Sequence, residues 1–239
     1  KASIAGADDQ GGFKQDTVLG LQVSKQINDS TSATGQLVSR GSDNYSTEAA
    51  WAFVSYAAND NLDLRMGRLR IPFFYYSDFL EVGYAYNWVR PPGEVYRIPF
   101  SSIDGISINT NMDNFGSRLS YNQAELNMTG PGGVQLSTMP DFQMTGQLTT
   151  FIEAALTYDN GTNSVVAEWT QLDYGTSAFL DDSAWLIGYA HRLDDISLHA
   201  TYTEHKTKYE SGTNGAIQKN PLLGLGDEQS SIILGMRYD

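Results

Sequence analysis

The sequence predicts an all-β fold, a transmembrane barrel of antiparallel strands that run up and down. Over most of the chain, apolar and polar residues alternate with the two-residue period of a strand. Short polar turns and longer loops separate these stretches in alternation, which is typical of a barrel with tight turns at one rim. No run reaches the roughly 18 apolar residues of a membrane helix, so a helical membrane protein is excluded.

The first part of the chain predicts four strands after a small polar arm at residues 1–12. The alternation begins at Thr17 and ends at a polar turn over residues 28–30. A loop with Gly, Ser, Asp and Asn follows the second strand, and a short polar turn precedes the fourth. The later three strands are predicted at residues 31–40, 49–57 and 62–70.

The second part is less regular but resumes the same rhythm. An Asn-Gly hairpin signal lies at residues 159–162, because Asn and Gly tolerate the positive φ of a primed turn. Residues 151–158 are readable as a strand or a short helix, and residues 206–226 as a long polar loop. The other strands are predicted at residues 106–108, 117–128, 134–139, 164–174, 184–193, 196–205 and 231–238. We expect about ten to twelve strands, no internal repeat and one domain over residues 1–239.

Alternation alone does not distinguish a barrel from a soluble β-sandwich, since both give strands with one apolar and one polar face. The clearest strand has Ile196 and Leu198 on one face and His199 and Thr201 on the other. The mean hydropathy of −0.34 is typical of a soluble protein, but a barrel strand offers only every second residue to lipid. Aromatic residues at or near strand ends favour the barrel. The predicted lipid-interface aromatics are Trp51, Trp169, Trp185, Tyr189 and Tyr202.

One long segment, residues 70–104, has no regular period and is rich in Tyr, Phe, Pro and Arg. Loops of this length are uncommon in compact domains and are usually functional. Its charges, with those just before it, predict a pore lining in which arginines face carboxylates and screen solutes by charge and size. Alternatively, these charges hold the loop to a wall by ion pairs. The predicted lining residues are Arg65, Arg68, Arg70, Asp78, Glu81, Arg90, Glu94 and Arg97.

Several classes of function are excluded or lack support. The formal net charge of −13 argues against nucleic acid as a partner, because too few basic residues are present to neutralise phosphates. The chain has no cysteine, and no Gly-x-Ser-x-Gly or phosphate-binding loop is present. His199 and His205 are six residues apart, about 20 Å along a strand, which is too far for one metal ion. We therefore expect no enzymatic reaction, no cofactor and no metal, and an outer-membrane lipase would need a catalytic set that the sequence does not display.

The segment from 61 to 108 resembles Gram-negative outer-membrane porins of the general diffusion type. The resemblance rests on Gly67-Arg-Leu-Arg-Ile-Pro-Phe73, Tyr76-Ser-Asp78, Val82-Gly-Tyr-Ala-Tyr86 and Trp88-Val-Arg-Pro-Pro92. It implies a 16-stranded barrel, commonly a homotrimer among outer-membrane lipid and lipopolysaccharide, in which residues 70–104 fold inward as a constriction loop. Such porins are longer and end in an aromatic residue, whereas this chain stops at Asp239. We therefore expect the sequence to be incomplete at its C-terminus.

Together these observations predict a passive channel for ions and small hydrophilic solutes in the outer membrane of a Gram-negative bacterium. The solute and the ion preference stay open, because the acidic net charge and the arginine cluster favour opposite ions. The alternative is a soluble or surface β-sandwich that binds carbohydrate through the aromatic residues between Phe73 and Trp88.

Overall fold

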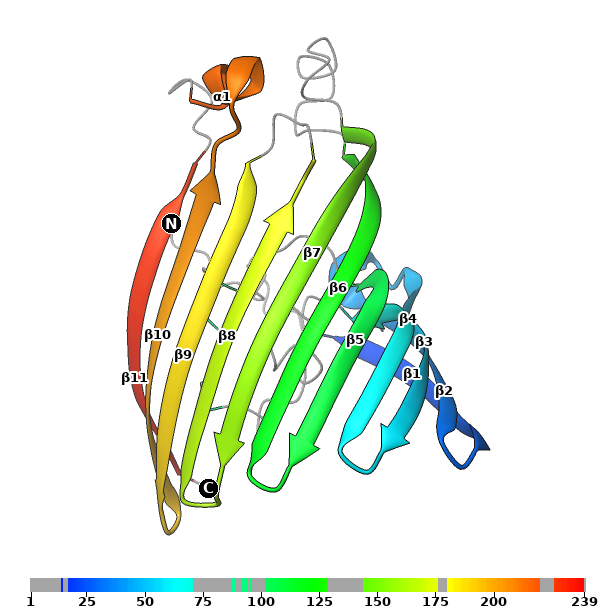
Figure 1. Cartoon of the computed structure of the whole chain (residues 1–239), viewed down its shortest axis with the longest axis vertical. Coiled ribbons are helices and arrows are strands. Elements are labelled where there is room, and N and C mark those ends of the chain that lie inside the picture. The colour runs from blue at the N-terminus through cyan, green and yellow to red at the C-terminus, as the bar shows by residue number, and fades with distance from the viewer. Residues whose placement is uncertain are drawn as a thin grey trace.

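The computed structural model shows one curved antiparallel sheet of eleven strands (Figure 1). It describes residues 14, 17–70, 87–88, 92–93, 95, 102–128, 144–175, 180–219 and 226–238. Each strand pairs with the one before it and the one after it, in the order β1 to β11. The sheet is therefore a meander whose described edges are β1 and β11.

The strands agree with the predicted meander. They are β1 (Val18–Asn28), β2 (Thr31–Arg40), β3 (Thr47–Asn59), β4 (Leu62–Arg70), β5 (Ser102–Met112), β6 (Phe115–Met128), β7 (Met144–Asp159), β8 (Asn163–Asp173), β9 (Asp181–Leu193), β10 (Ile196–Lys208) and β11 (Glu228–Tyr238). The segment left open between strand and helix is a strand, β7, and the strand predicted at residues 134–139 lies outside the described residues. The alternative prediction of a β-sandwich is wrong, because the described strands form one sheet and not two packed sheets.

Tight turns join the strands at one rim, the lower one in Figure 1. Side chains of Asn and Asp close these turns by accepting hydrogen bonds from backbone N–H groups two residues later. Asn28 Oδ1 accepts from Ser30 N at 3.0 Å, Asn59 Oδ1 from Asn61 N at 2.9 Å, and Asp159 Oδ1 from Gly161 N at 2.8 Å. These residues form turns for local reasons, which is why the sequence predicted them.

The opposite rim carries the longer connections. A 3-10 helix, Gly41–Asp43, lies between β2 and β3, and α1 (Gly212–Gln218) lies between β10 and β11. The predicted polar loop at residues 206–226 is thus partly wrong, since β10 extends to Lys208 and a helix follows. Among the described residues, no helix has the length and apolar character needed to span a membrane.

A register shift interrupts the β2–β3 ladder. Gln36 pairs with Trp51 while Leu37 pairs with Ala49, so Ala50 is an extra residue on β3. Such a bulge bends its strand and changes the direction of the neighbouring side chains. It lies next to Trp51.

Candidate functional site

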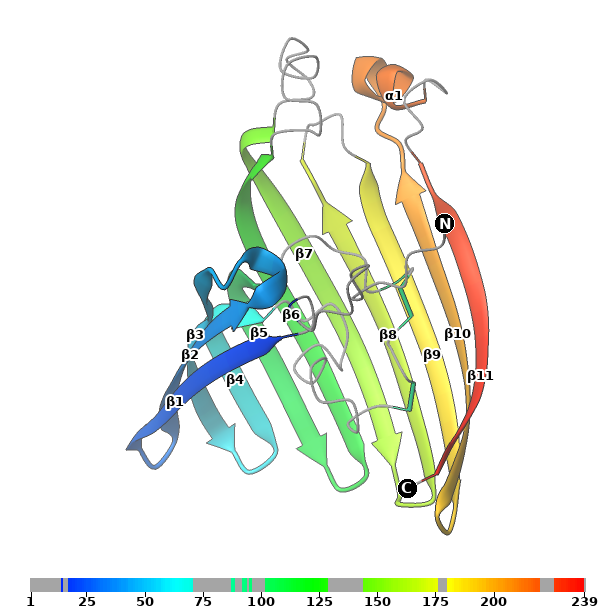
Figure 2. The same ribbon diagram turned by 180° about the vertical axis from the view of Figure 1, so that it is seen from behind.

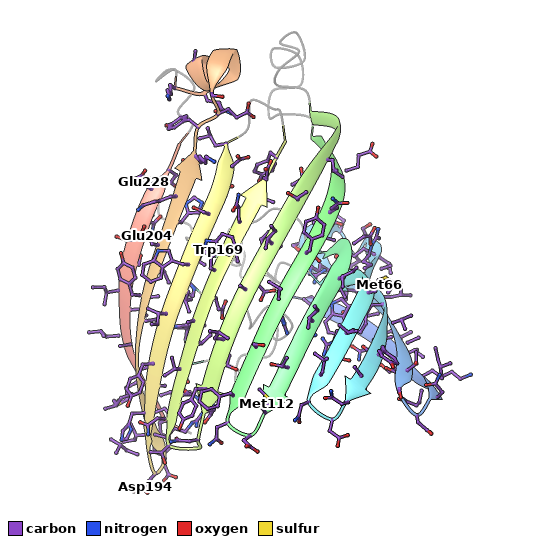
Figure 3. The ribbon with its side chains drawn as sticks, in the orientation of Figure 1. Met66, Met112, Trp169, Asp194, Glu204 and Glu228 are labelled. Atoms are coloured by element: carbon purple, nitrogen blue, oxygen red, sulfur yellow. The ribbon has the colours of Figure 1, made fainter. Side chains whose placement is uncertain are left out.

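The sheet has two faces of opposite character, and the convex one is apolar. We call it the outer face; Figure 3 labels Met66, Trp169 and Glu204 on it. Its large side chains are exposed: Leu234 is 75% exposed and Leu156 65%. Others on this face are Val54, Ile106, Leu119, Tyr121, Ile187, Leu198, Ile232 and Met236. Large apolar side chains are exposed on almost every strand of this face, which is unusual for a soluble monomer, so the face is suited to an apolar environment.

The concave side, seen in Figure 2, is the inner face, and its buried side chains include many polar ones. They include Ser107, Ser120, Asn122, Thr149, Glu153, Glu168, Thr170, Ser197, His199, Thr201, Thr203 and His205. A soluble protein shows the reverse, with buried apolar and exposed polar residues. The predicted faces of β10 are confirmed, because Ser197, His199 and Thr201 are buried whereas Ile196 and Leu198 are exposed.

One side chain from the connection between β4 and β5 reaches the inner face. The indole Nε1 of Trp88 donates a hydrogen bond to Thr201 Oγ1 at 3.0 Å, and both residues are buried. This contact joins positions 113 residues apart in the chain. It links one residue of the long aromatic segment to β10, a strand far from β4 and β5 in the sheet.

Carboxylates also lie on the inner face. Glu153 on β7 is fully buried, and its Oε2 accepts a hydrogen bond from Ser120 Oγ at 3.1 Å. Ser120 in turn accepts from Asn122 Nδ2 at 3.1 Å. Glu168 on β8 is 4% exposed. It pairs with Ala155, two positions after Glu153 on β7, so the two carboxylates are near each other on the same face. Two buried carboxylates are costly in an apolar interior, so they point to a polar interior.

Two arginines lie nearer the tight-turn rim of the inner face. Arg65 Nε is 2.8 Å from Asp63 Oδ2, and its guanidinium lies 5.7 Å from the ring centre of Phe53. Arg118 Nε donates to Asn109 Oδ1 at 3.0 Å. Both belong to the lining of a cavity of about 720 Å³ formed at the ends of β1 to β6.

The structure separates the predicted lining residues. Arg65 lies on the inner face, whereas Arg68 lies on the outer face, where its Nε is 3.3 Å from Asp104 Oδ1. Only the backbone of Arg70 is described. The remaining five, Asp78, Glu81, Arg90, Glu94 and Arg97, lie outside the described residues.

Four of the five predicted interface aromatics share the outer face. Trp169 and Trp185 pair directly across β8 and β9, and the ring centres of Trp185 and Tyr202 are 4.9 Å apart. Tyr189 lies nearer the tight-turn rim and donates to Asn163 Oδ1 at 2.7 Å. Trp51 differs from this expectation: it lies with Phe53 on the inner face, opposite Gln36.

Sequence reasoning missed Glu153, Glu168 and Arg118. Glu153 lies on β7 between the buried apolar residues Phe151 and Ala155, Glu168 follows the buried Val166 on β8, and Arg118 lies on β6. The available signal was alternation, since Glu168 alternates with the outward-facing Ala167 and Trp169. In β7 that signal was weak, because both faces contain apolar residues.

Two of the histidines lie on the inner face of β10. His199 and His205 share the inner face as predicted, and His205 Nε2 is 3.0 Å from Asp182 Oδ1. Gly235 gives the His199 ring its space, because a Cβ there would clash with His199 Nε2. Within the described ranges, no group of three or more His, Cys, Asp or Glu side chains is close enough to hold a metal ion.

Tyr174 follows β8 in the connection to β9 and is 8% exposed. Burial raises the pKa of its phenol, and the nearby carboxylates of Asp182 and Asp181 raise it further. Asp181 Oδ1 also accepts a hydrogen bond from the backbone N of Tyr174 at 3.1 Å. This connection is therefore tied closely to the start of β9.

Solved structures with this architecture exist. OmpT of Vibrio cholerae, an outer membrane protein studied as a loop L8 deletion mutant, aligns with a TM-score of 0.50 and 11% identity, covering 93% of this chain and 80% of that one. The chain has a porin-like fold. The trimer form of in-vitro folded OmpT (TM-score 0.48, 13% identity, 93% and 75% covered) and Salmonella typhi OmpF in complex with daunomycin (0.49, 14%, 93% and 78%) also align. No protein-family model and no curated protein matches the chain.

At 11% identity the similarity to OmpT shows the fold alone. The porin-like meander nevertheless agrees with the two faces described above, since such barrels have an apolar band outside and a polar interior. Glu153, Arg65 and the Trp88–Thr201 contact lie on the inner, concave face of this porin-like sheet.

Proposed function

We propose that this protein is an outer-membrane pore through which ions and small hydrophilic solutes diffuse passively. The observation that carries the proposal is the reversal of polarity between the two faces. Leu234, at 75% exposure, is typical of the outer face, while Glu153 is fully buried on the inner one. A closed wall with these faces would separate lipid from a polar lumen. Passive diffusion requires no reaction and no cofactor, so we propose that the protein is not an enzyme.

The proposal includes a constriction formed by residues 70–104. Its support is the hydrogen bond from Trp88, within this segment, to Thr201 on the inner face of β10. Arg65 contributes from β4, and Arg70, Asp78, Glu81, Arg90, Glu94 and Arg97 remain proposed members of the lining. Arg68 is left out, because its guanidinium pairs with Asp104 on the outer face. Charge at the narrowest point of a lumen would select ions by the local field.

We further propose a single-domain barrel that reaches 16 strands when complete and assembles as a homotrimer in the outer membrane. The likeness to OmpT, an outer membrane protein with a trimer form, motivates the trimer. Lipid and lipopolysaccharide would contact the outer face, with aromatic rings at the membrane interfaces. The proposed interface residues are Trp169, Trp185, Tyr189 and Tyr202, which share that face.

Single-channel conductance tests the proposal. The intact protein is refolded in detergent and added to a planar lipid bilayer under a salt gradient. We expect stepwise, ohmic openings, and a reversal potential whose sign reports the ion preference. Folded protein, verified by its β-sheet circular dichroism, that inserts into vesicles and gives no openings would refute the channel function.

A further inference from the structure

Two aromatic side chains occupy an unexpected place, the polar inner face of β3. Trp51 and Phe53 point to the same side as Ser55, with their ring centres 6.0 Å apart. Both are partly exposed. The β-bulge at Ala50 lies directly beside Trp51. Bulges are frequent next to functional sites, where they change the direction of a side chain.

Polar and charged side chains lie between this aromatic pair and the tight-turn rim. Arg65 lies over the ring of Phe53 and is also paired with Asp63. Ser55, Asp63 and Arg65 all line the cavity of about 720 Å³. The inner-facing residues of β3 from Trp51 to Ser55 therefore lead into the cavity, and together they form what we call the path.

The composition of the path indicates the kind of ligand. The cavity's volume is within the roughly 300–1,000 Å³ of small-molecule sites. Its described lining carries the carboxylates of Asp29, Asp60 and Asp63 and the guanidinium groups of Arg65 and Arg118. These charges nearly balance, and the rest of the lining is mostly Ser, Thr and Asn. A strongly charged solute would gain little net attraction there, whereas hydroxyl groups would find both donors and acceptors.

The aromatic end of the path offers ring surface rather than the indole N–H of Trp51. Trp51 Nε1 is buried and has no hydrogen-bond partner within the part of the chain that the structure describes. The partly exposed portion of Trp51 is therefore its ring, which is available to a solute in the lumen. Sugar rings combine an apolar C–H face, which can cover an aromatic ring, with hydroxyl groups around the edge.

We propose that Trp51, Phe53 and the adjoining Arg65–Asp63 pair form a binding track for neutral sugars on the inner wall. This inference rests on the proposed channel function and goes beyond it, because it gives the pore a preference for one class of solute. The aromatic rings cover the apolar face of the sugar, and Arg65, Asp63 and Ser55 bond its hydroxyl groups. Sugar would then occupy the lumen saturably instead of only diffusing through it.

Current block by maltotriose tests the track. Single channels of the intact protein are recorded with increasing maltotriose, and a polyethylene glycol of equal hydrodynamic size serves as the probe for simple exclusion. We expect saturable block by maltotriose and only a proportional fall in current with the polymer. The variants W51A and F53A should weaken the maltotriose block by about tenfold, since each removes one stacking surface.

V54A is the matched control, because Val54 lies between Trp51 and Ser55 in sequence but faces outward. Maltotriose should block the V54A channel as strongly as it blocks the wild-type channel. Two results would overturn the sugar track while the channel function stands. One is that maltotriose reduces the current no differently from the polymer, and the other is that W51A and F53A leave the block by maltotriose unchanged. Absence of channels in the wild type would instead refute the proposed function.

Discussion

The indole N–H of Trp88 donates to the hydroxyl of Thr201 at 3.0 Å, across the inner face of the sheet. Both side chains are buried, so neither can exchange this bond for one to bulk water at no cost. Within the part of the chain that the structure describes, this bond attaches the aromatic segment to the wall. It can be removed without altering the outer face.

Replacing Thr201 with valine keeps the shape of the side chain and removes the acceptor. We expect T201V to lower the free energy of unfolding by about 1–3 kcal/mol, because the Trp88 N–H loses a buried partner. Urea titration in vesicles, followed by tryptophan fluorescence, measures it, and channel recordings should show added current noise. A200V, one residue away on the outer face, should leave the noise unchanged. Equal noise in both variants would exclude the attachment.

A charged side chain introduced on the outer face should destabilise the protein more when it lies deeper in the membrane. Ile187 lies between Ala167 and Tyr202 in the apolar band, while Gln171 lies on the same face beyond Trp169. We expect I187R to destabilise the membrane-inserted protein by roughly 2–4 kcal/mol and Q171R by about 0–1 kcal/mol. Urea unfolding from lipid vesicles compares the two. Equal losses at both positions would contradict a lipid-facing band.

Arg65 and Arg68 form a matched pair for testing which face lines the lumen. Each is paired with an aspartate, Asp63 or Asp104, but they lie on opposite faces. R65Q would leave Asp63 without its partner and should raise the cation-to-anion permeability ratio about fivefold, which corresponds to on the order of 1 kcal/mol. R68Q should not change the ratio. Reversal potentials in a salt gradient measure both, and a larger shift for R68Q would reverse the assignment of faces.

The phenol of Tyr174 should lose its proton at a higher pH than an ordinary tyrosine does. Because burial and the carboxylates of Asp182 and Asp181 raise its pKa, the folded state keeps the proton at a pH where the unfolded state releases it. Its stabilising contribution is therefore present below the unfolded value of about 10 and is lost as pH rises through the folded pKa. Ultraviolet absorbance of the phenolate should show a late component that Y174F lacks. If Y174F titrates like the wild type, the assignment fails.

Local patterns predicted most of the fold. The faces of β10 followed from period-two alternation, and the turns after Asn28, Asn59 and Asp159 from side chains that cap their own backbone. The helix α1 was missed, because Gly212 and Asn214 favour turns in isolation. For the site, alternation already separates Arg65 from Arg68, but the prediction grouped them by proximity in the sequence.

The sequence by itself determined a meander of two-faced strands, since alternation and turn chemistry act over a few residues. Only the tertiary structure decided what meets across the sheet. Trp88 and Thr201 are 113 positions apart, and no local pattern encodes a contact of that range. The bulge at Ala50 likewise interrupts the alternation beside Trp51, so its face depends on the pairing of β3 with β2 and β4. The apolar face and the polar wall were therefore predictable, whereas the residues that gather on the wall depended on long-range pairing.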